Sequence, residues 1–178
     1  MVAVNLATIS YMTASGIGAA ATIRVSNELG KQNLAGVRRA AFVLVAIGLV
    51  MMTAWALLFF AGHQLFPYLY VNEESVISIS STLILIAGIF QLSDGMQVIC
   101  IGALRGLHDV TVPSLLIFVS YWLIGLPLGY WLGLHTALGP VGIWSGLLIG
   151  LTLTATASFF RLRGLVRSRE KLQMLQVR

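Results

Sequence analysis

The sequence predicts an all-α integral membrane protein, a bundle of five transmembrane helices. Of its 178 residues, 58% are hydrophobic and only 10% are charged, whereas a soluble domain carries about 25% charged residues. This composition leaves too little polar surface to cover a water-soluble globule. Five apolar segments are each long enough to cross about 30 Å of hydrocarbon as a helix. These segments cover roughly residues 2–23, 37–61, 77–103, 112–134 and 141–160.

The basic residues predict the orientation of these helices. All eleven Lys and Arg lie at or beside the ends that follow the first, third and fifth segments. Basic residues collect on the cytoplasmic side, so we expect a multi-pass protein of the inner (plasma) membrane with a cytoplasmic C-terminus. Residues 1–161 would form the bundle, and residues 162–178 a basic tail along the membrane surface. The charges are therefore topology signals, which argues for membrane lipid and against nucleic acid as a partner.

The first segment is unusually polar for a helix that faces lipid. Asn5 and Thr8 share one face, because residues three or four apart are neighbours on a helix. Such side chains either bond to their own backbone and to neighbouring helices or line a hydrated cavity. Asn5 and Thr8 are thus candidate cavity-lining residues. We expect this helix to continue to Gly30, since glycine commonly ends helices.

The second segment is predicted to be a structural span, because Thr53 is almost its only internal polar residue. Trp55 suits the outer membrane interface, where amphipathic rings collect. The connection that follows contains Pro67, Asn72 and Glu73 and neither Lys nor Arg, which is typical of an extracellular turn.

The third segment carries the carboxyl group of Asp94 deep inside its apolar run. Gln91 and Gln97 share its face at a spacing of three, and Phe90 lies one turn earlier. A carboxylate in hydrocarbon is costly and usually faces a cavity or a partner. Protonated, Asp94 would carry H⁺; ionised, it would hold Na⁺ among other oxygen ligands. We therefore predict a coupling-ion or proton site at Asp94, lined by Phe90, Gln91 and Gln97, with a purely structural hydrogen bond as the alternative.

The last two segments each contain a row of glycines at every fourth position. These rows predict close packing of the two helices, because burial inside a membrane gives no hydrophobic gain. The glycines are Gly125, Gly129 and Gly133 in the first row and Gly142, Gly146 and Gly150 in the second. Pro127 should kink its helix. It is a candidate hinge, and a static kink is the alternative.

The remaining reactive side chains exclude several kinds of site. Cys100 is the only cysteine, so an intrachain disulfide is impossible, and it should be a small membrane-buried side chain. The three histidines are far apart and predict no shared metal site, so we expect no cofactor and no metal apart from sodium at Asp94. An aspartyl intramembrane protease would need two membrane aspartates. We therefore predict that the chain is not an enzyme.

Three stretches, in this order, carry a family resemblance: residues 23–30 (IRVSNELG), residues 91–97 (QLSDGMQ) leading into residues 102–106, and residues 121–130 followed by residues 139–144. Together they resemble the multidrug and toxic compound extrusion (MATE) family, in its bacterial NorM-like branch. One departure is Ser26, where the family pattern would have glycine.

The resemblance implies that the chain corresponds to helices eight to twelve of a twelve-helix transporter with two six-helix bundles around a central cavity. The N-terminal bundle would then be a partner that this chain lacks. The implied function is cation- or proton-coupled antiport that exports drugs and other xenobiotics, chiefly small organic cations. Asp94 falls on the position that binds the coupling cation. Some members carry tyrosine where Phe90 stands, and a glutamate on the seventh helix, which this chain lacks, takes part.

Two other functions stay open at this point. A lipid-linked oligosaccharide flippase of the same superfamily would be expected to show basic residues in its cavity, and none lies deep within these spans. A non-transporting membrane scaffold subunit would fit if the five helices were the whole native protein.

Overall fold

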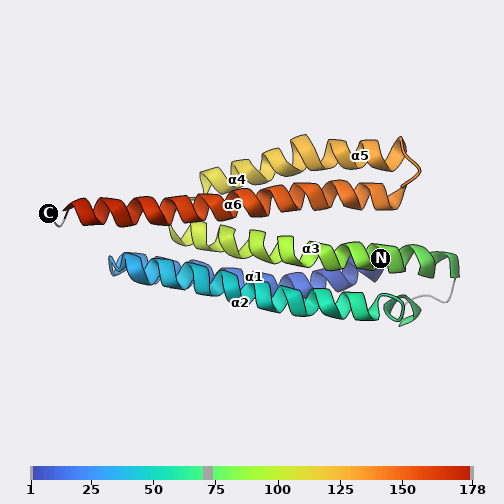
Figure 1. Cartoon of the computed structure of the whole chain (residues 1–178), viewed down its shortest axis with the longest axis horizontal. Helices are drawn as coiled ribbons and strands as arrows, with labels where there is room; N and C mark the ends of the chain where they lie inside the picture. The colour runs from blue at the N-terminus through green and yellow to red at the C-terminus, as the bar shows by residue number, and fades with distance from the viewer. Residues whose placement is uncertain (1, 70–73, 177–178) are drawn as a thin grey trace.

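The computed structural model describes residues 2–69 and 74–176, and it confirms the all-α fold predicted from the sequence. Five helices are long and apolar enough to span a membrane, and each contains one of the five predicted spans (Figure 1). In chain order the elements are α1 (Val2–Gly30), α2 (Leu34–Gly62), the 3₁₀ helix η1 (Phe66–Leu69), α3 (Glu74–Gly106), a composite helix of α4 (Thr111–Phe118), η2 (Val119–Gly125) and α5 (Leu126–Leu134), and α6 (Pro140–Gln176). The turn residues Asn72 and Glu73 lie outside the described residues.

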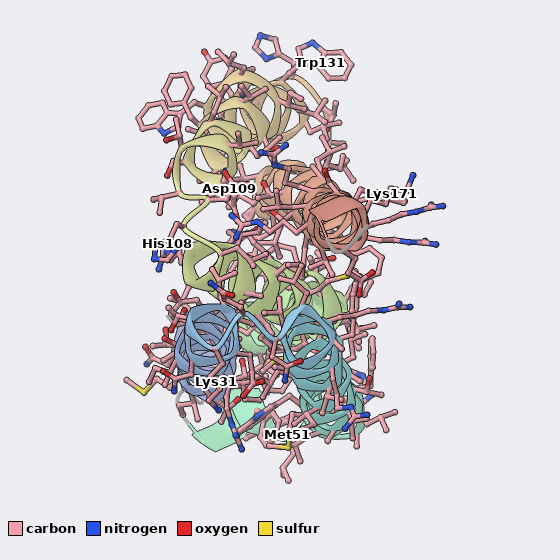
Figure 2. All side chains as sticks on the ribbon, turned by 90° about the vertical axis from the view of Figure 1, so that its left-hand side faces the viewer. Lys31, Met51, His108, Asp109, Trp131 and Lys171 are labelled. Atoms are coloured by element: carbon pink, nitrogen blue, oxygen red, sulfur yellow. The ribbon has the colours of Figure 1, made fainter. Side chains whose placement is uncertain are left out.

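Helix α3 lies at the centre of the bundle. It packs against α1, α2 and α6, while the composite helix packs chiefly against the opposite side of α6 (Figure 2). The larger apolar core gathers where these helices meet towards the basic end of the molecule. It includes Val25 of α1, Val45 of α2, Leu104 of α3 and Leu162 of α6, with Cys100 fully buried among them as predicted.

Small residues let α1 and α3 approach each other closely. A Cβ atom on Gly102 would collide with the backbone of Gly18, and a Cβ on Gly106 would lie 2.7 Å from the carbonyl oxygen of Thr22. The hydroxyl of Thr22 uses this proximity, because it donates a hydrogen bond to the Gly102 carbonyl at 2.9 Å. Backbone contact and an interhelical hydrogen bond replace hydrophobic burial as the source of stability.

The glycine rows bring the composite helix and α6 together, as the sequence predicts. A Cβ on Gly146 would collide with the backbone of Gly129 and lie 2.8 Å from the carbonyl oxygen of Gly125. A Cβ on Gly150 would lie 2.8 Å from the carbonyl oxygen of Ser120. The two helices therefore touch backbone to backbone along both rows.

The composite helix is interrupted just before Pro127. Residues Val119–Gly125 form a π-helix, and the N–H of Leu126 bonds to the carbonyl of Tyr121, five residues earlier. Pro127 has no N–H to offer the Leu123 carbonyl, and the wider π-helical turn ends two residues before it. Whether this weak place acts as a hinge stays a prediction.

The first connection ends α1 at Gly30, as expected. Asn33 caps α2 by accepting the N–H of Gly36 at 3.0 Å, and its amide nitrogen donates to Glu28 at 2.7 Å. Within this connection, the backbone of Gln32 adopts the left-handed conformation, with a φ of 57°. This connection, the α3–α4 connection and the end of α6 all lie at the same end of the bundle (Figure 1). The basic residues thus share one end, and its cytoplasmic location stays a prediction.

The tail continues the last spanning helix, and its location relative to the membrane surface stays a prediction. Helix α6 passes residue 161 without a break and continues to Gln176, in line with the spanning part (Figure 1). Just before the tail, Arg161 pairs with Asp109 of the α3–α4 connection at 2.8 Å. Within the tail, Arg169 donates to the carbonyl of Leu107 at 3.0 Å, and Glu170 lies 3.8 Å from Arg38. These contacts hold the start of the tail against the bundle.

Candidate functional site

The polar face of α3 is turned into the protein. Gln91 is 1% exposed and Gln97 is 9% exposed, while Asp94 between them is half-buried. The three side chains follow one another at a spacing of three, which keeps them on one side of the helix. Lipid cannot hydrogen-bond these groups, so packing of α1 and α6 around this face shields them.

A cavity of about 290 Å³ lies beside Asp94, between α1, α3 and α6. Each of the three helices contributes side chains to its wall. The lining residues are Val4, Ala7, Thr8 and Tyr11 of α1, Phe90, Gln91 and Asp94 of α3, and Trp144, Leu147 and Leu151 of α6. One carboxyl group therefore faces a space that is otherwise mainly apolar and aromatic.

The aromatic part of this wall is built by Phe90 and Trp144. Their rings stack at a centroid distance of 5.4 Å with an interplanar angle of 23°. Stacked aromatic faces attract cations through the ring quadrupole, and Trp does so most strongly. Together with the carboxylate of Asp94, this surface suits a flat organic cation.

Two oxygen groups at the cavity are available for a small cation. Among the described residues, nothing forms a hydrogen bond or an ion pair with the Asp94 carboxylate, and the buried Oε1 atom of Gln91 has no hydrogen-bond partner. A buried carbonyl oxygen left unsatisfied calls for an explanation. Carboxylate and amide oxygens are the donors that hard cations such as Na⁺ prefer. The donor set thus fits Na⁺, and it fits H⁺ at Asp94 equally well.

Histidine and cysteine do not contribute to this donor set. Within residues 2–69 and 74–176, no group of three or more His, Cys, Asp or Glu side chains lies close enough together to share a metal ion. A cation held here would therefore depend on one carboxylate and neutral oxygens. The hydroxyl of Thr8 donates its proton to the Val4 carbonyl at 2.8 Å, so its oxygen lone pairs point elsewhere and can accept a cation.

The structure brings together four of the residues predicted to form the site and leaves two outside. Thr8, Phe90, Gln91 and Asp94 line the same cavity. Asn5 is exposed on α1 outside this lining. Gln97 lies one turn beyond Asp94.

Gln97 contacts the composite helix instead of the cavity. Its side-chain oxygen accepts a hydrogen bond from the hydroxyl of Tyr121 at 3.1 Å. Tyr121 lies in the π-helical segment η2. This bond therefore connects the polar face of α3 to the irregular part of the neighbouring helix.

Sequence reasoning did not single out two lining residues, Tyr11 and Trp144. Tyr11 follows Thr8 by three residues, so the same face argument that selected Thr8 would have found it. Trp144 stands near the start of a span, where an aromatic residue is usually interpreted as an interface anchor. Its contact with Phe90 depends on how α6 crosses α3, which no local pattern indicates.

Comparison with known proteins identifies the family to which this fold and site belong. The family model of MatE matches residues 1–131. The chain belongs to the MatE family. Residues 23–30, 91–106 and 121–130, which carry most of the resemblance, lie within the matched residues, and the predicted family is confirmed.

Bacterial relatives place the MatE chain in the NorM-like branch. It is 40% identical over 162 residues to a probable multidrug resistance protein NorM of Xanthomonas campestris, covering 91% of this chain and 35% of that protein. It is 36% identical over 177 residues to the multidrug resistance protein NorM of Aliivibrio fischeri, covering 97% and 38%. Against the multidrug resistance protein MdtK of Yersinia pseudotuberculosis the identity is 37% over 168 residues, covering 92% and 37%.

Solved structures agree on the fold of this MatE chain. The crystal structure of the eukaryotic MATE transporter AtDTX14 superposes with a TM-score of 0.85 at 22% identity, over 96% of this chain and 39% of that one. An inward-facing multidrug resistance MATE family transporter of the MOP superfamily gives a TM-score of 0.81 at 20% identity, over 95% and 39%. The chain therefore spans little more than a third of the length of the proteins that it matches.

Proposed function

We propose that this chain is the C-terminal part of a cation- or proton-coupled antiporter that exports drugs and other xenobiotics, chiefly small organic cations. The family and the names of the bacterial relatives support drug export. One observation carries the coupling role. The carboxylate of Asp94 faces a cavity without a described partner, beside the unpartnered Oε1 of Gln91.

The chemistry of antiport follows from a single negative charge. Na⁺ or H⁺ would neutralise Asp94, and a cationic substrate would do the same by lying against the stacked rings of Phe90 and Trp144. Neither cation gains much from a carboxylate that is already neutralised. Binding of one therefore releases the other. The N-terminal bundle would supply the opposite cavity wall.

Replacement of Asp94 by asparagine in the full-length transporter tests this role. The change keeps the size of the side chain and removes its charge and its titrating proton. In proteoliposomes, we expect ethidium efflux driven by a Na⁺ or H⁺ gradient to fall to the leak rate, while the amount of inserted protein stays the same. Asp109→Asn makes the same chemical change outside the cavity and should keep efflux. Efflux at the native rate in Asp94→Asn would rule out the coupling role.

Comparing the two gradients assigns the ion, because only the physiological one should drive efflux in the native protein. The five-helix chain alone should not transport, since it supplies only one wall of the cavity. Efflux from that chain alone would overturn this part of the proposal. The flippase alternative is less supported, because the relatives carry multidrug resistance names. If Asp94→Asn and the native protein were equally inactive towards drugs, the scaffold alternative would gain support.

A further inference from the structure

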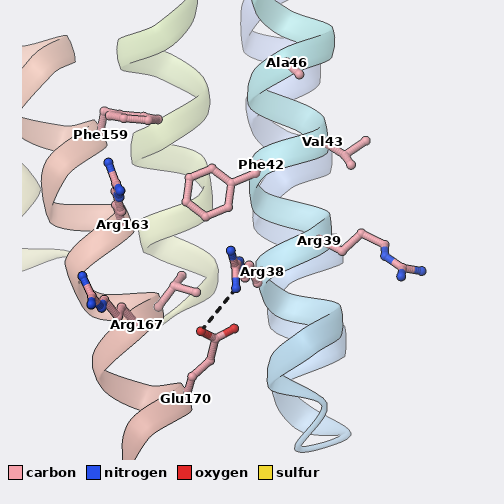
Figure 3. A pocket seen from close by; sticks show the side chains of 10 residues that line it. Arg38, Arg39, Phe42, Val43, Ala46, Phe159, Arg163, Arg167 and Glu170 are labelled. Atoms are coloured by element: carbon pink, nitrogen blue, oxygen red, sulfur yellow. Dashed lines mark ion pairs between the residues drawn. The ribbon is translucent and has the colours of Figure 1, made fainter.

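A second hollow lies far from Asp94, at the basic end of the bundle. It is a groove of about 840 Å³ between α2 and α6 (Figure 3). Phe42 of α2 and Phe159 of α6 meet edge to face inside it, with ring centroids 6.2 Å apart. Towards the basic end of the bundle, arginine side chains from both helices line the groove.

The charges of the groove do not balance. Arg38 and Arg39 come from α2, and Arg163 and Arg167 come from α6. Glu170 is the acid among the lining residues; it points towards Arg38 and lies 3.8 Å from it (Figure 3).

Within the described part of the chain, Arg163 and Arg167 have no ion-pair partner. They stand four residues apart on one helix, where like charges repel each other and cost stability. An anion between α2 and α6 would remove that repulsion.

The polarity of the groove changes in the same direction on both helices. One face of α2 carries Arg38, Phe42 and Ala46 at a spacing of four. Along α6, which runs the opposite way, Phe159 comes one turn before Arg163. On each wall the arginine therefore lies towards the end of the bundle, and the apolar residues lie towards the membrane interior.

We propose that this groove binds an acidic phospholipid from the leaflet on the basic side of the membrane. Arginine guanidinium groups bind phosphate oxygens in a bidentate manner, and basic pockets between transmembrane helices bind anionic headgroups. The acyl chains lie along Phe42 and Ala46. A free phosphate would leave this apolar half of the groove unused. The proposal does not depend on transport.

Native mass spectrometry of the purified full-length transporter tests the site, with phosphatidylglycerol and phosphatidylcholine of identical acyl chains as probes. We expect the chain to retain phosphatidylglycerol preferentially. The double variant Arg163→Gln/Arg167→Gln should lower that preference by roughly fivefold for each arginine removed, from the usual contribution of a basic residue near an anionic membrane surface. The matched control Arg24→Gln/Arg105→Gln removes the same charge at the same end, outside the groove, and should keep the preference. An equal loss in both double variants, or no preference in the native chain, would overturn the proposal.

Two further variants separate the headgroup from the acyl chains. Ala46→Trp fills the apolar half and leaves every arginine in place, so it should reduce retention of phosphatidylglycerol. Glu170→Gln removes the competing carboxylate beside Arg38 and should increase retention. Glycerol phosphate should not displace the lipid, and displacement by it at equal concentration would contradict a lipid site. A dimer in the spectrum that Arg163→Gln/Arg167→Gln abolishes would instead assign the groove to a second copy of the chain.

Discussion

Replacement of Gly146 by alanine should separate the composite helix from α6. The added Cβ would collide with the backbone of Gly129 and lie 2.8 Å from the carbonyl oxygen of Gly125. Carbon atoms in contact are about 3.5–4.0 Å apart, so the helices must part by roughly 1 Å. The obstructing atoms belong to the backbone, and no rotamer change relieves the collision. Overpacking of this kind costs about 1–3 kcal/mol, and we expect a value in the upper half of that range.

Gly164 provides a matched control in the same helix. A Cβ there would meet nothing within 4 Å, so Gly164→Ala adds the same methyl group without a collision. Gly164 lies beyond the predicted span, where alanine favours the helix over glycine by up to about 1 kcal/mol. The free energies of unfolding of the two variants should thus differ by about 2–4 kcal/mol, with Gly146→Ala destabilised and Gly164→Ala unchanged or stabilised.

Reversible unfolding by sodium dodecyl sulfate in bicelles measures both variants, with tryptophan fluorescence as the signal. Gly146→Ala should shift the midpoint to lower detergent fraction, and Gly164→Ala should leave it unchanged or raise it. Equal midpoints for the two variants would refute the backbone contact between the glycine rows.

Two predictions concern the proposed hinge and the orientation. Pro127→Ala restores an N–H for the Leu123 carbonyl and should make the composite helix more regular. If Pro127 is a hinge, this change slows efflux by the full-length transporter without lowering its thermal stability. Unchanged efflux would indicate a static kink. Lys171→Cys places an exposed thiol on the tail, and Cys100 is fully buried, so a membrane-impermeant maleimide should label this variant only after cells are opened; labelling of intact cells would reverse the predicted topology.

The spans could be predicted from the sequence because each depends on a local quantity. Length and hydropathy determine where a helix crosses a membrane, and each predicted span lies within one observed helix. The contacts of the tail could not be predicted in this way. Arg169 reaches the carbonyl of Leu107, 62 residues earlier in the chain.

The candidate site was predicted in part, for a similar reason. A carboxylate in an apolar run marks the helix that carries the site, and periodicity selects its neighbours on that helix and on α1. Gln97 lies on the same helix as Asp94 and on the same face, and it still contacts Tyr121 outside the cavity lining. Which polar residue faces the cavity and which faces another helix depends on the crossing of α3 with α6 and η2. Such crossings involve contacts between distant residues.

The exposure pattern of α3 gives independent physical support for a lipid environment. Around Asp94 the apolar side chains of Ile89 and Leu92 are 50% and 42% exposed, whereas the polar side chain of Gln91 is 1% exposed. Water would favour the opposite arrangement, because it stabilises exposed amides and penalises exposed apolar surface. In hydrocarbon the apolar side chains lose nothing by exposure, and the amide must be enclosed. Enclosing Gln91 beside the half-buried Asp94 brings the scarce polar groups of the bundle together at one place. For this reason we assign the proposed coupling chemistry to the cavity beside Asp94 and not to the larger arginine-lined groove.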